Sequence, residues 1–114
     1  RETFIVLQIE TPGALANVDE IAAVDGVDGL FVGPADLGLR LGQAGGNADL
    51  DQAIARVAEA AQKHGKAWGM PAGTPEALAA LRAQGAQLLA YGGDFALAKV
   101  LADCSDDLDR AFGE

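Results

Sequence analysis

The sequence predicts an α/β fold of four successive βα units that form the C-terminal half of a (β/α)8 TIM barrel. Short β-branched and apolar runs alternate with segments whose apolar residues have helical spacing. Runs that are apolar on both faces and separated by helices are typical of a parallel sheet covered by helices. Three of them end in Gly and small residues, as "VGPAD", "WGMPAG" and "YGGD", which would build one crowded rim. The alternative, a Rossmann sheet, is disfavoured because the chain contains no G-x-G-x-x-G motif.

The first unit begins with "TFIVLQIE" at 3–10, a β-branched apolar run that predicts a strand. The following segment, 12–26, places Leu15, Val18 and Ile21 at helical spacing and stops at Gly26. One helix is therefore expected between the first strand and the second.

The second unit starts with the strand "GLFVGPAD" at 29–36 and continues through a Gly-rich loop, "QAGGN", at 43–47. A plain connector is expected for this loop, with a lid as the alternative. The longest expected helix covers 47–65 and ends at Gly65 as its C-cap.

The third unit consists of a strand at 66–73 and a helix that starts with Thr74 as N-cap and ends at Gly85. The fourth consists of a strand at 86–94 and a closing helix at 94–114, which is either continuous or interrupted near Ser105. A TIM barrel has about 250 residues, so four units in 114 residues amount to nearly half of one. We therefore expect 1–114 to be a partial barrel whose N-terminal half is missing, the more so because Arg1 stands directly before a strand.

Composition excludes several classes of partner. With 17 acidic and 8 basic residues, the net charge of −9 would repel a nucleic-acid backbone or an anionic membrane. No apolar run approaches the roughly 20 residues that span a bilayer. The single cysteine, Cys104, forms neither a disulfide framework nor a cysteine metal site, which fits a reducing cytoplasm.

A candidate site is expected where the first two strands end. Gln8 and Glu10 share one face of the first strand because side chains alternate, and Asp36 occupies the corresponding place one strand later. Two carboxylates and an amide at one rim suit a hard cation such as Mg²⁺, which takes oxygen ligands and few protein carboxylates. The simpler alternative is that Asp36 caps a helix and that Glu10-Thr11-Pro12 marks a helix start.

The stretches "QIET" at 8–11 and "GVDGLFVGPADL" at 26–37 resemble the HpcH/HpaI aldolase family, the metal-dependent pyruvate aldolases related to citrate lyase β chains. The similarity is strongest over residues 5–38 and continues more loosely through "GKAWGMPAG" and "LLAYGGD". The resemblance implies a (β/α)8 barrel that cleaves 4-hydroxy-2-oxo acids, or 2-keto-3-deoxy sugar acids, into pyruvate and an aldehyde.

The resemblance also assigns residues. The two metal ligands of the family match Glu10 and Asp36, and its catalytic glutamine matches Gln8. Backbone amides of the GPAD turn, Gly33, Ala35 and Asp36, are expected to bind the pyruvate carboxylate, Pro34 having no N–H. A bound Mg²⁺, Mn²⁺ or Co²⁺ would stabilise the pyruvate enolate, so no Schiff-base lysine is required.

The chain departs from the family pattern in several places. The general-base histidine and the substrate-binding arginine of the family belong to the missing half. His64 is expected to complement a helix dipole, and Arg40 to be a solvated loop residue. Gly38 stands where many relatives have serine.

Three functional interpretations remain open at this stage. The first is the metal-binding half of a pyruvate aldolase, inactive on its own. The second is a nonenzymatic half-barrel that retains only metal binding and assembly. The third is an acyl-CoA lyase of the citrate-lyase β type, disfavoured by the form of the "FVGPADL" turn. Homo-oligomers are expected, because four parallel strands leave two unpaired edges.

Overall fold

The computed structural model describes residues 3–43 and 50–113. Most of the expected Gly-rich loop at 43–47 lies outside these residues. Four strands and six helices follow one another along the described chain: β1 (Val6–Ile9), α1 (Pro12–Ala16), α2 (Val18–Ala23), β2 (Gly29–Val32), α3 (Pro34–Gln43), α4 (Leu50–Lys63), β3 (Ala67–Ala72), α5 (Pro75–Ala83), β4 (Leu88–Tyr91) and α6 (Asp94–Phe112).

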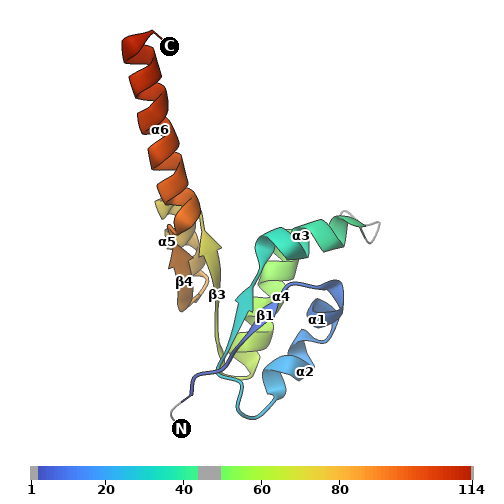
Figure 1. Cartoon of the computed structure of the whole chain (residues 1–114). Helices are drawn as coiled ribbons and strands as arrows, with labels where there is room; N and C mark the ends of the chain where they lie inside the picture. Colours follow the sequence, from blue (N-terminus) through green and yellow to red (C-terminus); the bar gives the residue numbers. More distant parts are fainter. Residues whose placement is uncertain (1–2, 44–49, 114) are drawn as a thin grey trace.

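The four strands form one parallel sheet in the order β1-β2-β3-β4, as Figure 1 shows. Each strand is followed by one or two helices before the next strand begins. The prediction of four successive βα units with a parallel sheet is therefore confirmed.

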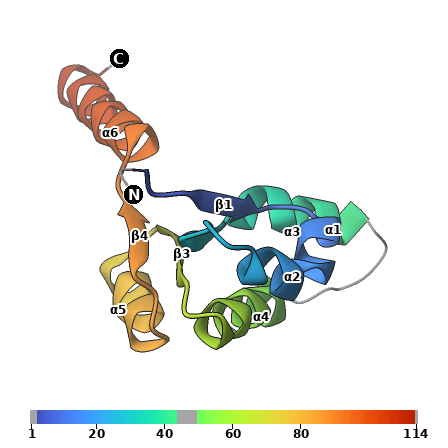
Figure 2. The ribbon, with the colours of Figure 1, turned by 90° about the horizontal axis from the view of Figure 1, so that it is seen from below.

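The helices α1 to α5 lie on one side of the curved sheet and leave its other face open (Figure 2). The helix side carries the core, where Leu30, Val32 and Trp68 are almost fully buried. Gln8 and its register partner Phe31 belong to the open face, and Gln8 is exposed there. The sheet is therefore covered by helices on one face only.

Two glycines on the open face allow β4 to approach β3 and β2 closely. A Cβ added to Gly69 would lie only 1.6 Å from the carbonyl oxygen of Leu88, and one added to Gly29 would lie 2.8 Å from Leu88 Cδ1. The backbone of Leu88 therefore occupies the space that a side chain at Gly69 would need, and the side chain of Leu88 occupies the space beside Gly29.

The helix expected over 12–26 is divided in two. Asn17 has φ −102° and ψ 15°, which separates α1 from α2. Its side-chain Nδ2 donates to the carbonyl oxygen of Gly13 at 3.0 Å. Asparagine side chains compete in this way with the helical hydrogen bonds of the backbone, and the continuous-helix prediction was wrong for that reason.

The second strand ends earlier than expected, at Val32, and α3 begins at Pro34. Proline has no N–H for the sheet and favours the first position of a helix. Asp36 consequently lies in the first turn of α3, not at the end of a strand.

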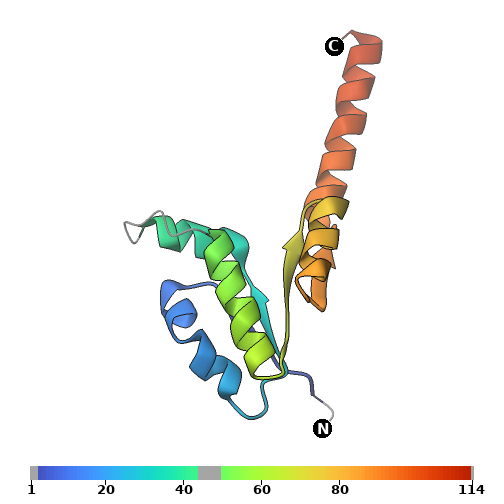
Figure 3. The ribbon, with the colours of Figure 1, turned by 180° about the vertical axis from the view of Figure 1, so that it is seen from behind.

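Helix α6 is continuous through Ser105, so the alternative of two short helices was wrong. An ion pair between Lys99 and Asp103 at 2.8 Å spans one turn, and Gly113, with φ 71°, forms the C-cap. The helix extends away from the sheet (Figures 1 and 3), and large apolar side chains such as Phe95 and Leu101 are exposed.

Within the residues that the structure describes, none of the helices has both the length and the apolar composition needed to cross a membrane.

Candidate active site

The candidate site lies at the edge of the sheet where β1 and β2 end. Ile9 pairs with Val32, so the next residues along the two strands, Glu10 and Gly33, lie beside each other. The N–H of Gly33 donates to the carbonyl oxygen of Ile9 at 3.1 Å and extends the ladder by one step. Carboxyl ends of parallel strands are where barrel enzymes place their reactive groups.

Gln8 and Glu10 form a hydrogen-bonded pair on the open face of β1. Gln8 Nε2 donates to Glu10 Oε2 at 2.9 Å. Gln8 is exposed and Glu10 is half-buried. The predicted sharing of one strand face is therefore realised as a direct contact, which holds one oxygen of the carboxylate in place.

Asp36 reaches the same edge from the first turn of α3, and its side chain is exposed. It is the third residue of that helix, so it is not the N-cap, whose position is occupied by Gly33. A carboxylate in a first turn is favoured by the helix dipole and remains available to an outside ligand. At the start of α1 the helix-start interpretation is confirmed, since Thr11 Oγ1 accepts from the amide of Ala14 at 3.0 Å.

The backbone amides of the GPAD turn are not equivalent. The Gly33 N–H is engaged with Ile9, and Pro34 has none. Ala35 and Asp36 are in the first turn of α3, where an N–H has no carbonyl four residues earlier in the helix to bind. The N–H groups of Ala35 and Asp36 therefore have no helical acceptor, as is general for the amino end of a helix, where anions can bind.

The donor set fits a magnesium-type cation. Two carboxylates and the carbonyl oxygen of a carboxamide are all oxygen donors, and Mg²⁺ commonly keeps water or substrate in its remaining positions. The described residues contain no group of three or more His, Cys, Asp and Glu that could hold a metal ion. Two carboxylates with substrate and water as further ligands do not require such a group.

The lysines and His64 are engaged elsewhere. Lys63 Nζ lies 2.8 Å from Asp19 Oδ2, and His64 Nε2 lies 3.1 Å from Asp19 Oδ1, so both contact α2 from the end of α4. Lys66 donates to the carbonyl of Val24 at 3.4 Å. His64 therefore lies near the amino ends of the strands, away from the candidate site, and has a specific carboxylate partner there in Asp19. The sequence alone predicts only an interaction with a helix dipole.

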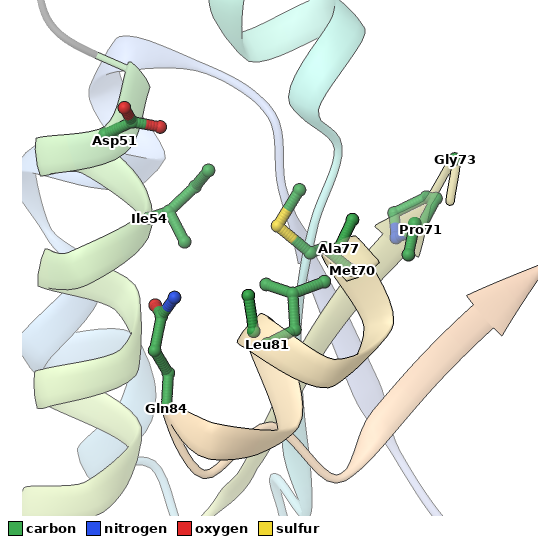
Figure 4. A pocket seen from close by; sticks show the side chains of 10 residues that line it. Asp51, Ile54, Met70, Pro71, Gly73, Ala77, Leu81 and Gln84 are labelled. Atoms are coloured by element: carbon green, nitrogen blue, oxygen red, sulfur yellow. The ribbon is translucent and has the colours of Figure 1, made fainter. Parts of the chain in front are cut away.

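A hollow of about 500 Å³ lies between α4 and α5, on the helix side of β3. Figure 4 shows Ile54, Met70 and Leu81 directed into it from three elements. Its lining is mainly apolar, and it includes none of Gln8, Glu10 and Asp36. The hollow is therefore separate from the candidate residues at the rim.

The sequence alone could not show that Gly33 lies against Gln8 and Glu10, where a side chain would clash. A Cβ there would lie 2.7 Å from Gln8 Nε2 and 3.2 Å from Glu10 Cβ. The signal in the sequence is a glycine at the end of a strand, which often marks close approach of another group.

Comparison with known proteins identifies the family. The model of the HpcH/HpaI aldolase/citrate lyase family matches residues 1–99. The chain belongs to this family. The resemblance seen in "QIET" and "GVDGLFVGPADL" is thereby confirmed.

Relatives in the HpcH/HpaI family share about two fifths of their residues with this chain over the matched region. A hydroxypyruvate/pyruvate aldolase of Delftia acidovorans is 38% identical over 100 residues, which are 86% of this chain and 37% of the relative. A 2-dehydro-3,6-dideoxy-6-sulfogluconate aldolase of Pseudomonas putida is 45% identical over 96 residues, 81% of this chain and 37% of the relative. The chain thus spans about a third of the length of these relatives.

A solved HpcH/HpaI aldolase/citrate lyase family structure from Burkholderia cenocepacia superposes with a TM-score of 0.80 at 34% identity. The superposition covers 94% of this chain and 43% of that one. Four βα units that match under half of a family member are consistent with half of a barrel.

Proposed function

We propose that the chain carries the metal- and pyruvate-binding side of a metal-dependent aldolase. The observation that carries the proposal is the hydrogen-bonded pair of Gln8 and Glu10, placed beside the amino end of α3 with Asp36 in its first turn. Carboxylates and free helix amides at one rim form a site for a divalent cation together with an organic anion.

Each residue has a role in this proposal. Glu10 and Asp36 hold the cation, and the amides of Ala35 and Asp36 bind the carboxylate of pyruvate. Gln8 orients the Glu10 carboxylate through the 2.9 Å hydrogen bond. A bound Mg²⁺, Mn²⁺ or Co²⁺ would supply Lewis-acid stabilisation of the negative charge that develops on the pyruvate half of the substrate, worth several kcal/mol.

The proposed substrates are 4-hydroxy-2-oxo acids or 2-keto-3-deoxy sugar acids, which are cleaved to pyruvate and an aldehyde. The names of the Delftia and Pseudomonas relatives, a hydroxypyruvate/pyruvate aldolase and a 2-dehydro-3,6-dideoxy-6-sulfogluconate aldolase, support this class. The site binds the half of the substrate that these compounds have in common, which leaves the aldehyde half to other parts of the enzyme.

Turnover is proposed to need further βα units. The family's general base and arginine have no counterpart at this rim among the described residues: His64 contacts Asp19 at the opposite edge, and Arg40 is an exposed residue of α3. We propose that residues 1–114 supply four units of an eight-unit barrel and are inactive without the other four. A nonenzymatic half-barrel that only binds metal and assembles is the second candidate.

Assembly into homo-oligomers is part of the proposal. Strands β1 and β4 are the two edges of the sheet, and α6 exposes Phe95 and Phe112 by 85% and 75%. Apolar surface of this extent is stabilised by contact with another copy or another domain. We further infer a reducing location such as the cytoplasm, which suits the exposed free thiol of Cys104.

The test is an aldol-addition assay on the chain together with whatever upstream units its gene encodes. Pyruvate and a panel of aldehydes are incubated with Mg²⁺, Mn²⁺ or Co²⁺, and 4-hydroxy-2-oxo acid products are detected by mass spectrometry. Product formation that stops with a chelator and returns with metal supports the proposal. An acyl-CoA thioester as the only accepted substrate would favour the citrate-lyase β type of reaction instead.

A further inference from the structure

Gly33 stands at the centre of the candidate site, yet neither its backbone conformation nor its N–H explains the choice of glycine. It is absent from the described glycines with positive φ, so alanine could adopt its backbone conformation. Its N–H is bonded to the Ile9 carbonyl, as any amino acid other than proline would allow. The feature left to explain is the absence of a side chain.

The space beside the Gly33 Cα is filled by Gln8. A Cβ at this position would lie 2.7 Å from Gln8 Nε2 and 3.6 Å from Gln8 Cδ, although nonbonded carbon contacts normally lie at about 3.5–4.0 Å. The same Nε2 is the atom that donates to Glu10 at 2.9 Å. The amide thus reaches the carboxylate through the volume that a methyl group at position 33 would occupy.

We propose that Gly33 is a positioning residue that acts through Gln8. By lacking a side chain it lets the Gln8 amide hold the Glu10 carboxylate in the orientation needed for the divalent cation. This inference rests on the proposed function, because it assigns a purpose to the pair only if Glu10 is a ligand. Hydrogen bonds to a ligating carboxylate are known to raise metal affinity in this way.

The substitution Gly33→Ala tests the inference selectively. The obstacle is the far end of a flexible side chain, so Gln8 can swing away while the backbone stays in place, and Glu10 Cβ at 3.2 Å needs to yield by only a few tenths of an ångström. Gly38→Ala is the matched control: Gly38 lies in α3, the helix that follows Gly33, and its Cβ would make an ordinary 3.7 Å contact with Leu50.

Two measurements read out the effect. The first, without metal, is the ¹⁵N resonance of the Gln8 side-chain amide, assigned by comparison with Gln8→Ala. It is expected to shift in Gly33→Ala and to stay unchanged in Gly38→Ala. The second is Mn²⁺ affinity by calorimetry, expected to fall at least tenfold in Gly33→Ala, as outer hydrogen bonds to metal ligands typically contribute about 10–100-fold. Gln8→Ala should lose affinity similarly, and adding Gly33→Ala to it should cost little more.

The outcomes separate this inference from the proposed function. A wild-type chain that binds no Mn²⁺ contradicts the proposed function, while the metal-free amide resonance still decides whether Gly33 makes room for Gln8. A wild-type chain that binds Mn²⁺, with a Gly33→Ala variant that binds equally well or keeps the wild-type Gln8 resonance, overturns the inference alone. The inference would also be overturned if the double variant lost as much Mn²⁺ affinity as the Gln8→Ala and Gly33→Ala losses combined, since the two residues would then act independently.

Discussion

The Gln8 side chain donates a 2.9 Å hydrogen bond to the Glu10 carboxylate along one face of β1. The pair lies against Gly33 of the neighbouring strand end, and the first turn of α3 follows at once. The hydrogen bond from its own strand restricts the orientation of the Glu10 carboxylate, as a ligand for a cation requires.

The 114-residue chain by itself is expected to have no aldolase turnover, even with added Mg²⁺ or Mn²⁺. Positioning of substrate and proton transfer each contribute large factors to the rate, and His64, the one histidine among the described residues, contacts Asp19 away from this rim. The measurement is release of pyruvate from a 4-hydroxy-2-oxo acid, coupled to lactate dehydrogenase. Turnover comparable to that of an intact family member would mean that the catalytic base lies among these residues.

Gly69→Ala is expected to destabilise the fold by roughly 2 kcal/mol or more, since overpacking commonly costs 1–3 kcal/mol and here the obstacle is backbone. The new Cβ would lie 1.6 Å from the Leu88 carbonyl oxygen, so β3 and β4 would have to separate. Urea denaturation followed by circular dichroism measures the effect. Gly73→Ala, where nothing lies within 4 Å and φ is not positive, is the control and should change stability little. Equal stabilities of the two variants would refute the close approach of the strands.

Asp19 is expected to stabilise the fold in a pH-dependent manner. The hydrogen bond from Lys63, followed by that from His64, holds the pKa of the Asp19 carboxyl below its ordinary value of 3.8. A carboxyl group whose pKa is lower in the folded state stabilises the fold above its unfolded pKa. This contribution is lost as the pH falls below about 4 and through the lowered folded pKa.

Thermal unfolding of Asp19→Asn and wild type between pH 2.5 and 7 measures that contribution. The difference between the two proteins should be small, because the carboxylate is exposed, and should shrink at the acid end. Asp106→Asn, an exposed change on α6, is the control and should show no such convergence. A difference that stays constant with pH would contradict the role of the Asp19 ion pairs.

Helix α6 is expected to drive association. Val100 and Leu101 are 56% and 62% exposed on a helix that extends away from the sheet (Figure 3). Sedimentation velocity at high micromolar concentration should show dimers or larger species, and Val100→Gln with Leu101→Gln should shift the distribution towards monomer. Asp109→Asn, which changes a polar residue of the same helix, should leave the distribution unchanged. A compact wild-type monomer at these concentrations would be the contrary result.

The order and type of the strands could be predicted because buried parallel strands are continuously apolar and are separated by helix-length segments. The alternation of side chains along the first strand likewise placed Gln8 and Glu10 on one face, and their hydrogen bond agrees with it.

Other features could not be predicted. The second strand was expected to end at Asp36 but ends at Val32, because Pro34 starts a helix directly after the apolar run. The break at Asn17 depends on one side-chain bond to Gly13, which periodicity does not encode. Gly33 illustrates the same limit, since its contact with Gln8 exists only after two strands pair.

The most direct test of the central proposal is a Mn²⁺ titration of the chain, followed by electron paramagnetic resonance of the free ion. The wild type is expected to bind one Mn²⁺, and Glu10→Gln and Asp36→Asn should each weaken binding at least tenfold, because each removes an anionic ligand while changing side-chain volume little. Unfolding midpoints should stay close to wild type, since Asp36 is exposed and Glu10 only half-buried. Asp25→Asn, the same chemical change after α2, should bind like wild type. Equal Mn²⁺ affinity in wild type, Glu10→Gln and Asp36→Asn would show that these carboxylates do not form the metal site.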